Sequence, residues 1–180
     1  MTSVSGDFEL TMDELRAVAR YAVVSAEEVL PVFEADSPDD PRPRAAVGAA
    51  REFVNGARRT KLQRTTALDA HRAAREATTE AARLAARAAG DAAAAAYLHP
   101  IAKASQVGHI LRAAASAARV GELNAGAGPA VGLELIERAR RRATPALIDV
   151  LCRYPLAPPG KSRVAELMSV LDASLRAAGR

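Results

Sequence analysis

The fold of this chain is decided by the segment EAARLAARAAGDAAAAAYLHP, residues 80–100. It lies within a longer stretch, from Gly56 to Gly121, that is rich in Ala and Arg. Alanine loses no side-chain entropy on entering a helix and arginine loses little, so this composition strongly favours helix. A helix lined with Ala presents a thin apolar face and must approach its neighbours closely to bury it. The stretch therefore predicts several closely packed helices.

The overall composition agrees with a small helical domain. The chain has 180 residues, which suffices for one domain with its own core, and only 3% of them are aromatic. No apolar run approaches the ~18 residues of a membrane span, and residues 1–10 lack the pattern of a secretory signal. We therefore expect a cytoplasmic protein with no membrane contact. The single cysteine, Cys152, excludes an internal disulfide, and we expect it to be buried.

Helix signals divide the N-terminal two thirds of the chain. A capping box at Thr11 starts a helix that should end near Pro31 or Phe33. Leu62 and Leu68 should lie on the inner side of the third helix. We predict a break near Thr78, because a continuous helix to Leu98 would be about 60 Å long. The later helices are expected at about residues 43–55, 58–76, 80–98 and 101–118.

The C-terminal third contains turn and proline signals. Residues 121–129 are rich in Gly and predict a loop, and helices follow at about 129–142 and from Thr144. A Pro-rich linker then precedes an amphipathic helix at about 162–178. The sequence thus predicts an all-α fold. It consists of a single Ala-rich bundle of about seven helices in residues 1–155 and, in residues 156–180, the linker and the C-terminal helix. That helix should dock back on the bundle, although it could instead pair with a second copy in a homo-oligomer.

No catalytic signature is found, and we expect a protein without enzymatic activity, metal or cofactor. The three histidines are His71, His99 and His109, and they form neither an HExxH motif nor a pair spaced for a shared metal. They could converge if their helices lie side by side. We expect hydrogen-bonded histidines in or beside the core, with a metal-dependent enzyme as the remote alternative.

Basic residues form two clusters, which could bind anions or nucleic acid. Aromatic side chains that would stack on bases are missing from both, so a solvated basic face is favoured and nucleic acid is not the expected partner. The first cluster consists of Arg58, Arg59, Lys61 and Arg64, and the second of Arg138, Arg141 and Arg142, with Arg140 between them.

Several motifs in the central stretch resemble those of a known family. They include Arg42-Pro-Arg-Ala-Ala, Phe53-Val-Asn-Gly, Ala70-His-Arg-Ala-Ala-Arg and Ala85-Ala-Arg-Ala-Ala-Gly-Asp-Ala. Over about residues 10–155 the chain is similar to the Imm-5-like putative immunity proteins of bacterial polymorphic toxin systems. It departs from them at Phe53 and Asp91, where members often carry Trp and His. The resemblance implies an all-helical, non-enzymatic protein that binds and neutralises a toxin made by the same cell.

Acidic residues are concentrated at the start of the chain. Residues 1–40 hold ten acids against two arginines, whereas the whole chain carries a net charge of +4. An acidic surface of this kind would suit a basic toxin. The alternative, which we favour, is that the acidic segment packs across the basic body of the same chain. The candidate partner-binding residues are Glu27, Glu28, Asp36, Asp39 and Asp40.

Overall fold

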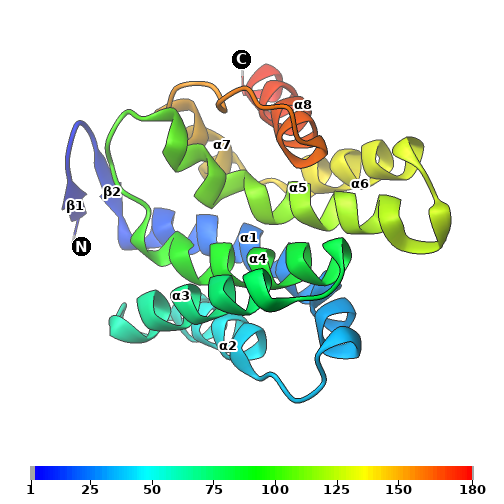
Figure 1. Ribbon diagram of the computed structural model, residues 1–180. Helices are drawn as coiled ribbons and strands as arrows, with labels where there is room; N and C mark the ends of the chain where they lie inside the picture. Colours follow the sequence, from blue (N-terminus) through cyan, green and yellow to red (C-terminus); the bar gives the residue numbers. More distant parts are fainter. Residues whose placement is uncertain (1–2, 180) are drawn as a thin grey trace.

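The computed structural model describes residues 3–179, and it is built almost entirely from helices (Figure 1). The all-α prediction is confirmed. A two-stranded antiparallel hairpin, which the sequence analysis did not foresee, precedes the first helix and pairs Val4 with Leu10. The elements are β1 (Ser3–Ser5), β2 (Glu9–Thr11), α1 (Met12–Asp36), α2 (Arg42–Val54), α3 (Lys61–Glu76), α4 (Glu80–Ala94), α5 (Val107–Leu123), α6 (Pro129–Arg142), α7 (Pro145–Cys152) and α8 (Arg163–Ala178).

The helices pack in layers around α1 and α4 (Figure 1). Both of these helices contact α2 on one side and α5 on the other, while α3 packs on α2 and α4. The second half of the chain is built onto α5, which contacts both α6 and α8. The Ala-rich stretch therefore supplies α3, α4 and α5, and these helices form the frame for the rest of the molecule.

Alanine allows the close packing that the composition predicts. In α4, seven alanines are buried, because nearly every side of this helix meets a neighbour. Larger side chains fill the remaining space from the surrounding elements, and Phe33, Phe53, Ile110 and Leu147 are at most 1% exposed. Close packing of this kind tolerates little change in side-chain volume.

The predicted helix boundaries are confirmed at several caps. Thr11 makes the expected capping box with Glu14, and Thr144 caps α7. The break near Thr78 is also confirmed, because α3 ends at Glu76 and Thr79 caps α4 through the backbone N–H of Ala82.

Four local predictions are wrong. The first helix continues through Pro31 to Asp36, since this proline is exposed and water can bind the carbonyl group left without its N–H partner. Leu62 and Leu68 are 43% and 56% exposed, because the smaller alanines of α3 face α4 instead. Cys152 is exposed at the end of α7. Gly121 belongs to α5, where a β-carbon would lie 2.2 Å from Leu135, so it permits close packing with α6.

The start of the fifth helix is also later than predicted. The chain after Leu98 is irregular, and α5 begins only at Val107, after a short 3-10 turn at Ala104–Gln106. The N-terminal hairpin holds this irregular segment, because the backbone N–H groups of Asp7 and Phe8 both donate to the carbonyl of Pro100. The same hairpin contacts the end of α7, where the rings of Phe8 and Tyr154 meet edge to face at 4.9 Å.

The C-terminal helix docks on the bundle, as favoured. Its apolar stripe of Leu167, Met168, Leu171 and Leu175 is buried against α5, α6 and α7. The side chains expected to pair with a second copy are therefore used within the chain, and a homo-oligomer through this helix stays an untested prediction. Among residues 3–179, no helix is both long and apolar enough to span a bilayer.

Candidate functional site

The acidic residues of α1 are paired with basic residues of the same chain. Glu27 binds Arg51 through two hydrogen bonds of 2.6 and 2.5 Å, and Glu28 forms an ion pair with Arg138 at 3.1 Å. This is the intramolecular arrangement that the sequence analysis favoured. Charges that already neutralise one another attract a distant partner weakly.

The acidic side chains at the end of α1 and in the loop after it are also mostly engaged in hydrogen bonds. Asp36 accepts hydrogen bonds from the hydroxyl and the backbone N–H of Thr78, and the hydroxyl contact lowers the pKa of its carboxyl group. Asp40 binds Arg42, which also reaches Glu76. Within residues 3–179, only Asp39 of the five predicted acidic positions has no hydrogen-bond or ion-pair partner. Arginine therefore neutralises Glu27, Glu28 and Asp40, whereas Asp36 and Asp39 have no basic partner among residues 3–179, and the acidic partner site stays a prediction.

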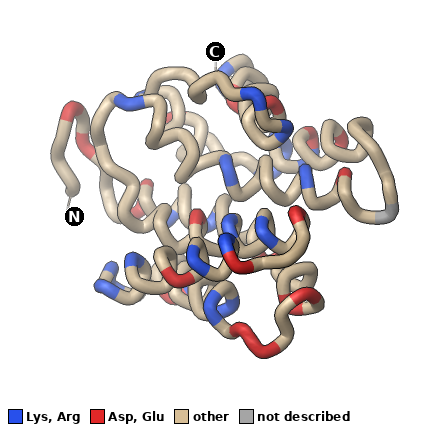
Figure 2. The backbone as a smooth tube through the Cα atoms, in the orientation of Figure 1, with Lys and Arg blue, Asp and Glu red and all other residues tan. Residues whose placement is uncertain are grey.

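The first basic cluster lies at the start of α3, where Lys and Arg gather (Figure 2). The guanidinium groups of Arg59 and Arg64 lie 4.6 and 4.3 Å from the centre of the Tyr97 ring. The expectation that no aromatic side chain accompanies this cluster is therefore wrong, since Tyr97 reaches it from the short 3-10 turn that follows α4. The ring is engaged by arginines, which leaves it less available to stack on a base. Arg58 and Lys61 have no ion-pair partner in the part of the chain that the structure describes.

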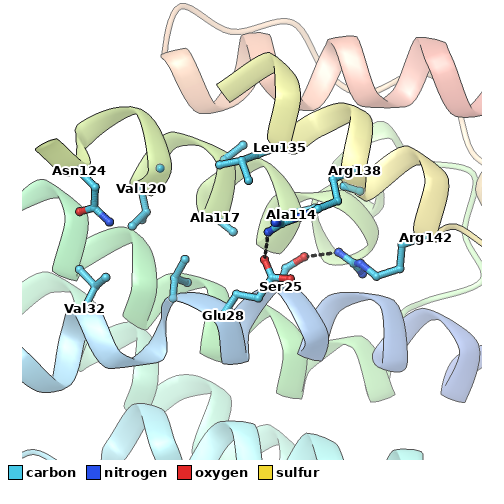
Figure 3. Close-up of a pocket in the computed structure, with 14 residues that line it drawn as sticks. Ser25, Glu28, Val32, Ala114, Ala117, Val120, Asn124, Leu135, Arg138 and Arg142 are labelled. Carbon is cyan, nitrogen blue, oxygen red and sulfur yellow. Dashed lines mark hydrogen bonds and ion pairs between the residues drawn. The ribbon is translucent and has the colours of Figure 1, made fainter. Parts of the chain in front are cut away.

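The second basic cluster divides between two surfaces. On the outer face of α6, Arg141 and Arg140 both bind Glu137, and these contacts lower the pKa of Glu137 to about 2. Arg138 and Arg142 instead point toward α1 (Figure 3). The four neighbouring arginines therefore serve different roles, which the sequence alone could not separate.

Arg138 and Arg142 cross a gap between α1 and α6. Arg142 donates to the backbone carbonyl of Tyr21 at 3.0 Å and to the hydroxyl of Ser25 at 2.7 Å, and it also stacks on the Tyr21 ring. The Tyr21 hydroxyl donates to the carbonyl of Ala139 at 3.0 Å, and burial raises the pKa of that hydroxyl to about 12. Since α6 packs chiefly on α5 and α8, these long side chains provide its main connections to α1.

A small pocket lies beneath these bridges, and we call it the α1–α6 hollow (Figure 3). Its volume is about 160 Å³. One wall comes from α1, the floor from the Ala-rich face of α5, and the other wall from α6. Arg138 and Arg142 stand at one end, and Asn124 at the other. The apolar lining consists of Val29, Val32, Ala114, Ala117, Ala118, Val120, Leu135 and Ala139.

The hollow brings together residues from two competing predictions. Glu28 belongs to the proposed acidic partner site, whereas Arg138 and Arg142 belong to the proposed anion site. Sequence reasoning did not connect them, because they are 110 or more positions apart. The one sequence signal for this site is the run of small residues on α5. Small side chains there leave a space when α1 and α6 lie too far apart to fill it.

The three histidines lie near one another on the other side of α5. Burial lowers the pKa of both His71 and His109, and His109 also experiences the charges of His71 and His99. His71 lies 3.7 Å from Asp91, and its ring covers Gly90 so closely that a β-carbon there would be 2.8 Å away. Within residues 3–179, no group of three His, Cys, Asp or Glu side chains is arranged to hold a metal ion.

Asp91 at the centre of this histidine group is held by arginine. Its carboxylate is fully buried and accepts two hydrogen bonds from Arg112, at 2.8 and 2.6 Å. A two-pronged contact of this kind fixes the orientation of both groups. Asp91 is therefore engaged in joining α4 to α5. The expectation of hydrogen-bonded histidines is wrong at His109, whose buried Nδ1 has no hydrogen-bond partner among residues 3–179.

Comparison with known proteins identifies one related family. The family model of the Imm-5 like putative immunity protein matches residues 9–127, about two thirds of the chain, from β2 to just before α6. No curated protein and no solved structure matches the chain. The matched region includes α1 and α5, which form one wall and the floor of the α1–α6 hollow.

Proposed function

Because the chain belongs to the Imm-5-like putative immunity protein family, we propose that it binds and neutralises a protein toxin of the same cell. It would act in the cytoplasm by covering the toxin, with no chemistry of its own. The observation that carries this proposal is the family match over residues 9–127, which includes all of the helices from α1 to α5.

The α1–α6 hollow supports binding rather than catalysis. It combines an apolar floor with a rim of charged side chains, Glu28 and Arg138, that are 43% and 64% exposed. Protein interfaces often bury a few anchoring side chains in such pockets and surround them with polar contacts. We therefore place the toxin-binding face over α1 and α6.

Protection of growing cells tests this function. The chain would be produced in a bacterial host together with a toxin domain encoded beside its gene, and growth would be compared with and without the chain. Purified mixtures would then be measured by size-exclusion chromatography with light scattering. We expect restored growth and a complex of defined mass. A toxin that kills equally well in both strains and elutes separately would contradict the proposal.

A nucleic-acid-binding module remains the alternative, and it would use the Arg58–Arg64 cluster. The arginines over Tyr97 weaken this alternative, because single-stranded nucleic acid is usually held by stacking on open aromatic rings. Retention of RNA or DNA that falls steeply as salt is raised would support it. We expect no such retention at physiological salt.

A further inference from the structure

We propose that the α1–α6 hollow receives a single apolar side chain of the toxin, and that Arg138 binds a carboxylate next to it. This inference rests on the proposed function and names the chemistry of the contact. The partner is therefore expected to present an aromatic or branched aliphatic residue beside an Asp or Glu.

The size of the hollow selects a side chain rather than a free metabolite. Its volume of about 160 Å³ is close to that of a protein cavity, ~150 Å³, that holds one benzene molecule. Pockets for small-molecule ligands are usually larger, roughly 300–1,000 Å³. One leucine or phenylalanine side chain would fill the hollow, whereas a cofactor would not fit.

The lining explains why this side chain should be apolar. Ala117 and Val120 of α5 form the floor, and Val32 and Leu135 stand on opposite walls (Figure 3). These four groups offer no hydrogen bonds, while the polar groups of the lining, including Ser25 and Asn124, come from other positions, so a polar atom placed among the four would lose its contacts with water without replacement. An apolar side chain would instead leave water favourably.

The charges at the rim favour an acidic neighbour. Glu28, Arg138 and Arg142 are the charged residues that line the hollow, which leaves one positive charge in surplus. Arg142 is held by Tyr21 and Ser25, whereas Arg138 uses one N–H group for Glu28. Because a guanidinium group has five N–H donors, Arg138 can donate to a second carboxylate while it still binds Glu28. It can also release Glu28 and bind the new carboxylate instead.

Binding of a small probe tests the chemistry without the toxin. Phenylacetate carries an aromatic ring next to a carboxylate, and benzyl alcohol carries the same ring without the charge. Each would be titrated into the ¹⁵N-labelled chain and followed by NMR. We expect saturable shifts at amides of α1, α5 and α6, with tighter binding of phenylacetate. No saturable shift at the hollow with phenylacetate would overturn the proposal.

Two substitutions separate the ring from the charge. Ala117→Leu would fill the hollow and should abolish binding of both probes, while Ala173→Leu, at an exposed position of α8, should leave binding unchanged. Arg138→Gln should weaken phenylacetate several-fold and leave benzyl alcohol unaffected. Equal binding of the probes to the A117L variant and to the unmodified chain would refute the assignment of the site.

The same variants distinguish this inference from the proposed function. A folded A117L variant that no longer protects cells, beside a protective A173L variant, would support both. If A117L protects fully, the hollow is not the toxin contact, although the immunity function stands. If the unmodified chain gives no protection, the proposed function fails, whatever the probes show.

Discussion

The two sides of α5 use the same kinds of residue in opposite ways. Toward α4, Ala-rich faces meet closely, and the Asp91–Arg112 pair is enclosed between the helices, with Asp91 fully buried. Toward α1 and α6, the Ala-rich face of α5 lines the hollow, and the Glu28–Arg138 pair spans the gap with side chains that are 43% and 64% exposed. Small residues produce a sealed core where two helices close over them, and a hollow where the helices stand apart.

The largest expected effect comes from breaking the buried pair. Arg112→Met would leave the Asp91 carboxylate buried with only the His71 ring, 3.7 Å away, beside it, and breaking a buried pair typically costs about 3–5 kcal/mol. Chemical denaturation followed by circular dichroism would measure the loss. Asp91→Asn is the informative companion, because Arg112 is 34% exposed and can turn toward water, so this variant should lose less. An equal loss of stability in both variants would contradict the expectation that an unpaired Asp91 costs more than an unpaired Arg112.

Enlarging an alanine should have different effects in the core and in the hollow. Ala89→Leu adds volume at a fully buried position of α4, and overpacking of this kind costs about 1–3 kcal/mol. Ala117→Leu places the same side chain in the α1–α6 hollow, where space exists, and should change the free energy of unfolding by less than about 1 kcal/mol. Thermal unfolding of both variants provides the measurement, and similar losses would argue that the hollow is not open.

Acid should lower the stability of the folded chain through its buried histidines. Burial lowers the pKa of His71 and His109 below the ordinary value of 6.5, so the unfolded chain takes up these protons first. Stability should therefore fall as pH drops below about 6.5, and it should continue to fall until the folded histidines are protonated. Melting temperatures measured between pH 7 and 5 test this. The double variant His71→Gln/His109→Gln should show a flatter profile over the same range.

The smallest effect is expected at the exposed pair. Arg138→Gln removes the ion pair with Glu28, and pairs this exposed contribute about 0–1 kcal/mol. The melting temperature should change little, while binding of an acidic partner should weaken. A loss of stability comparable to that of R112M would show that the bridge is structural rather than available for binding.

Local signals in the sequence predicted much of the fold and little of the site. The caps at Thr11, Thr79 and Thr144 depend on neighbouring residues, so the helix starts could be predicted from spacing alone. Leu62 and Leu68 were placed wrongly, because an apolar residue does not reveal which face of an Ala-rich helix is covered. The partners of Glu28 and Asp91 depend on helix packing, which carries no local signature.

The prediction of an acidic partner surface illustrates the same limit. Charge counting correctly identified an excess of acids in residues 1–40, but it could not show that Arg51 and Arg138 neutralise two of them. It also missed Tyr97, which is more than 30 positions after Arg64 in the sequence but packs against Arg59 and Arg64 in the fold. Composition indicates how much charge a segment carries, and only the fold determines how much remains free.

The N-terminal hairpin has a consequence for how the protein is made. Its contacts include Pro100 and, through Phe8, Tyr154, so this segment is translated well before two of its partners. At ~5–20 residues per second, synthesis of the intervening chain takes on the order of ten seconds. During that interval the hairpin lacks its contact with Tyr154. The hairpin should therefore reach its final packing only after Tyr154 has left the ribosome.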